Sequence, residues 1–338
     1  MKKIISTYLF FLFSFYLIAQ DFPTPIFGHA FCKSGVENAA PGRGLVIEYF
    51  LHPKYNLQSN FGNPNRKEKN KVDNKKFIEA KLKLPIINTD PFKMLIGFAH
   101  TYEKYDFEQI APPDNYLFQA IDDISLRRTR ASLILFKSLS YKNYLAIRLG
   151  ASYNGNYSGL VDFERRYAVY RASAIYGFKK NPNKELAIGL TLNNSFNRTL
   201  ILPFFLWNQT FNDKWGLSTI LPLKINVRRN FKNNSLLLVG YEYWSSAYSM
   251  DITPNDQDFA EDFHFRSSAI HFSADYQKRL VSDWTWIGIK AGWAMNFDSR
   301  FTRTTTDTVI DAFPSNSFFI SLSFFVSPPE RVRKALSK

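Results

Sequence analysis

One pattern recurs along this chain and limits the folds open to it: apolar and polar residues alternate with a period of two. The stretch "NSFFISLSFFV" (316–326) shows it near the end of the chain, where Ser321 and Ser323 share one side. Successive side chains of a β-strand point to opposite sides, so this stretch predicts a strand with one fully apolar face. That face is formed by Phe318, Ile320, Leu322, Phe324 and Val326. It requires either a soluble core or the hydrocarbon of a bilayer.

The same alternation returns along both halves of the chain. It is found at 45–52, 77–85, 127–136, 144–153, 167–178, 185–193, 223–229, 236–244, 268–277 and 286–297. Alternating segments of about ten residues, repeated this often, are typical of transmembrane β-strands. Unpaired backbone groups are intolerable in hydrocarbon, so such a sheet must close on itself. The sequence therefore predicts an all-β protein, a single antiparallel up-and-down β-barrel with an even number of strands, whose apolar faces contact lipid.

The composition agrees with a barrel that is apolar on one face of each strand only. Aromatic residues make up 17% of the chain, yet the mean hydropathy is −0.24. A helical membrane protein would be much more apolar than this. Aromatic side chains near strand ends suit the two headgroup belts of a bilayer; these are Tyr49, Tyr102, Tyr153, Phe178, Tyr243, Trp284, Trp286 and Trp293.

Connections between the predicted strands fall into two lengths. Short links rich in Asn, Asp, Pro and Lys lie at 138–143, 179–185, 230–235 and 279–284, and long polar loops lie near 53–73, 103–123, 154–164, 251–262 and 299–316. Outer-membrane barrels have short periplasmic turns and long external loops. The stretch 197–229 leaves the strand count open. Read as two additional short strands it gives 14, and read as a loop and one long strand it gives 12.

The first twenty residues indicate the compartment. A cationic start (Lys2, Lys3), an apolar run and a small residue at its end (Ala19) are the layout of a secretory signal peptide cleaved near residue 19 or 20. We therefore expect four parts: a signal peptide (1–20), an N-terminal periplasmic segment (21–41), the barrel (42–327) and a basic tail (328–338). The single cysteine, Cys32, is expected to be a small filler, because one thiol forms neither a disulfide framework nor a thiolate metal site.

Two further stretches carry a family resemblance. "LPFFLWNQTFNDKWGLSTILP" in the middle of the chain and "FFISLSFFVSPPERVRKALSK" at its end, together with the signal peptide, resemble a family of uncharacterised outer-membrane β-barrel proteins of Gram-negative bacteria, a domain of unknown function. The resemblance covers most of the mature chain. It implies fold and location in the outer membrane, and it brings no binding residues with it.

The charged residues on the faces opposite the apolar ones are the candidate functional residues. They are Glu48, Glu79, Lys81, Lys83, Arg128, Arg130, Arg148, Arg171, Lys224, Arg228, Glu242, Asp275 and Lys290. One interpretation is an ion-pair network that fills the lumen of a non-conducting structural or binding barrel. The other is a water-filled, porin-like channel in which the basic excess favours small anionic solutes. The net charge of +14 also suits anionic lipid headgroups and lipopolysaccharide as partners, whereas secretion argues against nucleic acid.

An outer-membrane hydrolase is the third alternative. It would need a nucleophile, a base and a carboxylate that converge at the outer rim. The available side chains are His52, His100, His264, His271, Asp122, Asp123, Asp262 and Asp275. No nucleophile motif or metal-ligand spacing connects them, so the sequence predicts no catalytic residue, no metal and no cofactor. Oligomeric state and cargo stay open.

Overall fold

The structure is a computed structural model that describes residues 31–60, 68–111, 116–196, 198–231, 234–253, 260–280 and 283–329. The predicted signal peptide and nearly all of the predicted basic tail lie outside these residues. Within the described ranges, no helix has the length and apolarity needed to cross a membrane.

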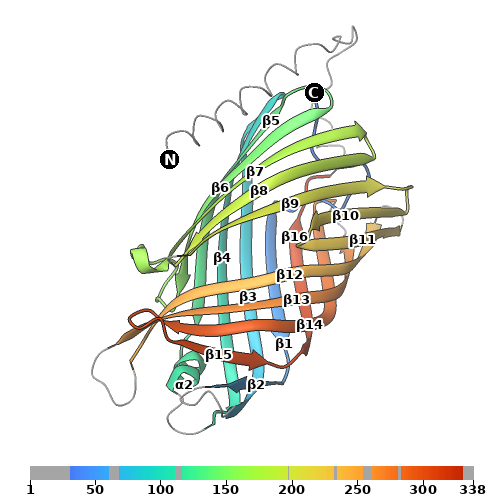
Figure 1. Cartoon of the computed structure of the whole chain (residues 1–338). Coiled ribbons are helices and arrows are strands. Elements are labelled where there is room, and N and C mark those ends of the chain that lie inside the picture. Colours follow the sequence, from blue (N-terminus) through green and yellow to red (C-terminus); the bar gives the residue numbers. More distant parts are fainter. Residues whose placement is uncertain are drawn as a thin grey trace, which may run out of the picture.

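The described residues form β-strands almost throughout (Figure 1). In the first half the strands are β1 (Leu45–His52), β2 (Tyr55–Ser59), β3 (Glu68–Asn88), β4 (Phe92–Gln109), β5 (Leu126–Ser138), β6 (Asn143–Gly155), β7 (Ala168–Asn181) and β8 (Lys184–Ser195). In the second half they are β9 (Arg198–Thr210), β10 (Trp215–Leu221), β11 (Lys224–Phe231), β12 (Ser235–Ile252), β13 (Glu261–Arg279), β14 (Thr285–Arg303), β15 (Val309–Pro314) and β16 (Ser317–Val326). A helix, α2 (Tyr116–Asp123), and a 3-10 turn, η1 (Arg165–Tyr167), lie in the connections.

The strands close into a single antiparallel barrel. Each strand from β3 to β14 pairs with its neighbours in sequence, and β1 closes the sheet by pairing with both β3 and β16. The segments β1 and β2 together form one strand of the wall, and β15 and β16 form another, because each pair is separated by only two residues. Counted in this way, the described residues make a closed barrel of 14 strands. The predicted all-β barrel is confirmed.

The stretch 197–229, which left the count open, holds three strands. β9 and β10 pair between Thr210 and Phe205, and β10 turns directly into β11, with the Leu223 N–H donating to the Ile220 carbonyl at 2.6 Å. A two-residue connection that contains Pro222 is turn chemistry. The reading that gives 14 strands is therefore the one that the structure adopts.

The two faces of the wall differ in burial as the alternation predicts. On β16, Phe318 is 48% exposed on the outer face, whereas the neighbouring Phe319 is fully buried inside. The outer face of the other long strands is similarly apolar and exposed. One aromatic residue was assigned to the wrong side: Trp286 is 9% exposed and stacks on Phe325 on the inner face. It alternates with Ile287, so the headgroup-belt prediction for Trp286 is wrong.

The long connections contain more regular structure than expected. Much of the predicted loops is strand that continues beyond the wall: β12 runs to Ile252, β14 runs to Arg303, and β2 and β15 pair with each other. The loop at 103–123 contains α2. The β8–β9 and β10–β11 connections take the places of long loops in the alternating order, but they contain only two residues each. The prediction that all connections at one end are long is therefore wrong for these two hairpins.

The N-terminal segment, residues 31–44, follows the inner rim at the short-turn end. Its Cys32 N–H donates to the Ser140 carbonyl at 3.2 Å, and its Glu37 N–H donates to the Pro182 carbonyl at 3.1 Å. Further along, the Asn38 carbonyl accepts from Asn230. The segment thus contacts β11 and two successive short turns before it enters β1. Cys32 is buried there.

Candidate functional site

Four arginines from three neighbouring strands line one cavity inside the barrel. Arg128 and Arg130 come from β5, Arg148 from β6 and Arg171 from β7. The cavity has a volume of about 100 Å³. We call this volume and its lining the cationic groove. Alternation on each strand places these side chains on the inner face, and pairing of the strands places them on four successive rows of that face.

The pairing register explains why the groove has room. Gly150 of β6 pairs with Arg171 of β7, and Arg171 pairs with Asn193 of β8. Directly paired residues share a face of the sheet, so these three form one row across the inner wall. Gly150 contributes no side chain to this row. Arg171 Nε donates to Asn193 Oδ1 at 3.2 Å, which orients the guanidinium along the row.

Positive charge dominates the groove. Glu79 forms ion pairs there with Lys81 and with Arg130, whose Nη2 lies 3.3 Å from Glu79 Oε1. Arg130 is also repelled by three other guanidinium groups: Arg128, Arg148 and Arg171. Lys83 is repelled by Lys81, Arg130 and Arg148. Clustered like charges in a partly desolvated volume attract a counter-ion, so this arrangement can bind an anion.

The other predicted residues lie elsewhere on the inner face and are mostly paired. Lys290 Nζ lies 2.9 Å from Glu48 Oε1, which also accepts from Ser321. Lys224 Nζ lies 3.0 Å from Glu242 Oε2. The remaining two predicted residues are Asp275 and Arg228. Asp275 Oδ2 lies 3.5 Å from Arg43 Nη2, and Arg228 Nη2 donates to Thr210 Oγ1 at 2.9 Å. The structure thus gathers Lys81, Lys83, Glu79 and the four arginines. The Lys290–Glu48 pair adjoins this group, because Glu48 of β1 pairs directly with Glu79 of β3.

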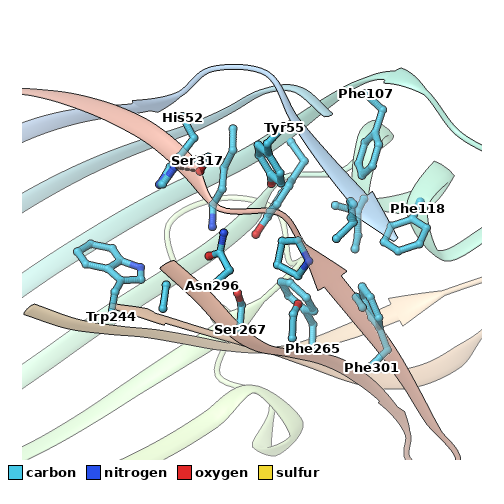
Figure 2. A pocket seen from close by; sticks show the side chains of 18 of the residues that line it. His52, Tyr55, Phe107, Phe118, Trp244, Phe265, Ser267, Asn296, Phe301 and Ser317 are labelled. Atoms are coloured by element: carbon cyan, nitrogen blue, oxygen red, sulfur yellow. Dashed lines mark hydrogen bonds between the residues drawn. The ribbon is translucent and has the colours of Figure 1, made fainter. Parts of the chain in front are cut away.

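A second inner region is filled by side chains. The ends of β12, β13 and β14 curl inward, and β12 meets β6 where Ser249 pairs with Gly155. Between these strands, β2 to β4 and α2 lies an apolar cluster that includes Phe118, Phe301 and Tyr248. We call it the filled compartment. It encloses a cavity of about 40 Å³, with Trp244 and His52 on one side and Phe118 and Phe301 on the other (Figure 2).

A buried carboxylate ties this compartment together. Glu103 of β4 is buried and receives three interactions: Lys75 Nζ at 2.8 Å, Tyr105 Oη at 2.9 Å and Tyr248 Oη at 2.7 Å. The last of these crosses the interior from β12. Buried charges are tolerated only when they are paired and hydrogen-bonded in this way.

The histidines considered for a hydrolase lie in different places. His52 and His271 belong to an aromatic group around Phe50, where His52 Nδ1 lies 3.0 Å from Ser317 Oγ. His100 is hydrogen-bonded to Thr129, and His264 stacks on Phe196. Among the described residues, no group of three His, Cys, Asp or Glu side chains is arranged to hold a metal.

Sequence reasoning missed several residues that the structure makes important. Glu185 is buried at the short-turn end and accepts from Gly35 N, Tyr144 Oη and Asn208 Nδ2 at 2.7–2.8 Å. Glu103 and Arg43 were missed as well. Each has at least one partner on an element that is not its neighbour in the sheet, such as Tyr248 for Glu103 and Gly35 for Glu185, and alternation alone carries no signal for such contacts. The alternation of 185–193 does predict that the Glu185 side chain points inward, but it does not predict its partners.

Fold and site together define a closed β-barrel with a cationic groove on part of its inner wall and a filled compartment beside it. The chain belongs to the family described as domain of unknown function (DUF6268), which matches residues 47–326. A comparison with curated protein sequences finds no match.

Solved structures of outer-membrane channels are similar to this chain. The COG4313 outer membrane channel from Pseudomonas putida F1 is 10% identical, with a TM-score of 0.42, over 87% of this chain and 99% of that one. The P. putida toluene transporter TodX is 8% identical, with a TM-score of 0.36, over 85% of this chain and 91% of that one. The Rhodopseudomonas blastica porin is 8% identical, with a TM-score of 0.24, over 83% and 99%.

Proposed function

We propose that this protein is an outer-membrane barrel that passes small anionic solutes along the cationic groove. The observation that carries the proposal is the gathering of Arg128, Arg130, Arg148 and Arg171 around one cavity. Rings and clusters of basic side chains replace part of the hydration of an anion and exclude cations. The apolar outer face and the predicted signal peptide support location in the outer membrane.

The route is narrow. The filled compartment occupies one side of the interior, and residues 31–44 line the rim at the short-turn end. Passage therefore runs along the inner faces of β5 to β8, and the segment 31–44 must move or leave space for the solute. The same two features favour a second candidate, a non-conducting barrel that binds an anion in the groove.

The test is the reversal potential of the pure protein in a planar bilayer under a salt gradient. We expect an anion-biased potential that weakens when Arg148 and Arg171 are both changed to Gln, and also in Arg128→Ala and Arg130→Ala. Lys137→Gln is the matched control, since Lys137 lies on β5 but is exposed on the opposite face from Arg128 and Arg130.

Three outcomes decide between the candidates. Anion bias that depends on Arg148 and Arg171 supports the channel. Cation preference contradicts it. Absence of conductance, combined with arginine-dependent binding of a small dianion such as succinate in calorimetry, replaces the channel with the binding barrel.

A further inference from the structure

The wall of the barrel has a window between β9 and β12. β10 has seven residues and β11 has eight, whereas a strand needs roughly 9–11 residues to cross a bilayer. Pairing of β9 with β10 starts only at Phe205, and pairing of β12 with β11 stops at Glu242. Among the described residues, no strand pairs with β9 over 198–204 or with β12 over 244–246 on the sides that face each other. Beyond 246, β12 is bonded to β6 through the Ala247 carbonyl and Asn154 Nδ2. Figure 1 shows the short β10–β11 hairpin filling this space at one end only.

Contacts frame the window at its far end. Arg266 Nη2 of β13 donates to the carbonyl of Ser195, the last residue of β8, at 3.2 Å. Phe196 stacks on His264 of β13, with ring centroids 4.8 Å apart. The window is thus a bounded opening: the β10–β11 turn lies at one end and the β8–β9 turn lies at the other.

The sequence of β9 is adapted to an edge. The Trp207 N–H donates to the Thr219 hydroxyl of β10, and the same hydroxyl donates to the Trp207 carbonyl. Backbone groups of alternate residues point to the same side of a strand, so those of the odd-numbered residues of β9 face β10 and, further along, the window. Pro203 is one of these odd-numbered residues. Proline has no N–H, so it fits an edge position, where no neighbouring strand needs that hydrogen bond. The remaining free backbone groups cannot face acyl chains alone. They require a hydrated volume behind them.

That volume is the cationic groove. Ser245 and Ala247 of β12 line the same cavity as Arg148 and Arg171. The Ala247 carbonyl accepts from Asn154 Nδ2 of β6 at 3.1 Å, so β12 lies against β6 from this residue on. From the other side, Arg171 pairs with Asn193, which pairs with Leu200 of β9. One continuous row therefore leads from the arginines to the edge of the window.

The edge of the window is apolar on both faces. Leu200 and Leu202, on the inner face of β9, are 39% and 37% exposed, and Ile201 on the outer face is exposed as well. Inner aromatic residues of β16 are fully buried by comparison. An exposed apolar strip beside a cationic cluster fits a ligand that has one apolar and one anionic part.

We propose that the β9–β12 window is a lateral passage through which an amphipathic organic anion, an apolar chain or ring with one carboxylate, exchanges between the bilayer and the cationic groove. The carboxylate meets Arg148 and Arg171, and the apolar part lies along Leu200 and Leu202. This inference rests on the proposed function and narrows its substrate class.

The opening is tested first, without any ligand. Single cysteines in a Cys32→Ser background are labelled with bimane, and the protein is folded into vesicles of lipids with brominated acyl chains. Leu202→Cys reports the inner face at the window, and Ile201→Cys reports the outer face. Ser273→Cys reports the inner face where the wall is complete, because Ser273 pairs with both Gly240 and Gly292. We expect quenching at Leu202 comparable to that at Ile201 and little at Ser273. Quenching at Leu202 as weak as at Ser273 would overturn the window.

The ligand is tested with dansylated undecanoate, an amphipathic carboxylate, against the matched dansylated alcohol. We expect the carboxylate to bind more tightly than the alcohol. Arg148→Gln with Arg171→Gln should abolish this difference. Leu200→Ser with Leu202→Ser should weaken carboxylate binding several-fold while the anion-biased reversal potential persists. Equal binding by the serine variant would contradict the proposal.

The two proposals fail in different ways. Anion-biased conductance without quenching at Leu202 leaves the aqueous channel standing and overturns the lateral passage. Quenching at Leu202 with arginine-dependent binding, but without conductance, supports the lateral passage and overturns the aqueous channel.

Discussion

The filled compartment and the cationic groove are built from the same wall but have opposite interiors. In the compartment, β12 reaches across to β6, and Tyr248 of β12, Phe301 of β14 and Phe118 of α2 belong to one buried apolar cluster. In the groove, only Ser245 and Ala247 of β12 share the lining with the arginines, because β10 and β11 end short, and Arg148 and Arg171 stay partly exposed. The comparison teaches that strand length, more than residue type, decides which part of this interior is packed.

The largest effect is expected from Glu103, which joins both sides of the filled compartment. Glu103→Ala leaves Lys75, whose side chain is only 15% exposed, without its partner, and breaking a buried pair costs about 3–5 kcal/mol. Urea unfolding from lipid vesicles, followed by the gel shift of unboiled samples, measures this. Arg171→Ala in the groove should change the free energy of unfolding by less than about 1 kcal/mol. Equal losses in the two variants would contradict the contrast between packed and solvated regions.

Next in size is a charge placed on the lipid face of the groove wall. Ala172→Arg and Ile147→Arg should each destabilise the folded barrel by about 2–4 kcal/mol if these positions lie at the bilayer midplane. The same vesicle unfolding experiment applies, and Arg171→Ala serves again as the inward-facing neighbour. A reversed order would show that the register of β7 is wrong.

A smaller effect is expected where the two regions meet. A Cβ added to Gly155 would lie 2.2 Å from Tyr167 Cδ1 and 2.7 Å from the Ser249 carbonyl. Gly155→Ala should therefore push β12 away from β6 and destabilise the protein by about 1–3 kcal/mol. Gly150→Ala is the matched control, because its Cβ would meet ordinary contact distances of 3.5 Å or more. Similar midpoints for the two variants would show that the β6–β12 contact does not close the compartment.

The smallest effect on stability, but a clear one on reactivity, is expected at the rim. Burial raises the pKa of the Cys32 thiol, so little thiolate forms at neutral pH and maleimide labelling should be slow and should accelerate as the pH rises. Glu185→Gln weakens the acceptor that holds Gly35 and should speed labelling at constant pH. An unchanged rate would show that Glu185 does not anchor residues 31–44.

Much of the wall was predictable because alternation is a local property. The faces of β6, β7 and β16 follow directly from residues such as Ile147, Ala172 and Phe319. The same rule misplaced Trp286, since a large aromatic on an inward position looks the same in sequence as one in a headgroup belt. By itself, the rule also assigns one side of β12 to lipid along its whole length. Beyond Tyr243 that side carries Ser245 and Ala247, which line the cationic groove. The smaller residues at these two positions are the sign of this change in the sequence.

The gathering of the arginines was only partly predictable. Their inward direction follows from each strand alone, but their placement on neighbouring rows depends on the register between β5, β6 and β7. Register is set by pairing and turns, so Arg171 could be assigned a face but not a neighbour.

The sequence by itself determined the class of fold, the apolar outer face and the basic character of the inner one, because a strand alternates its side chains whatever it pairs with. Only the tertiary structure decided that β12 crosses to β6, and that Glu103 and Glu185 find their partners. Each of these depends on contacts between residues far apart in the chain, and the period of two carries no information about such distances.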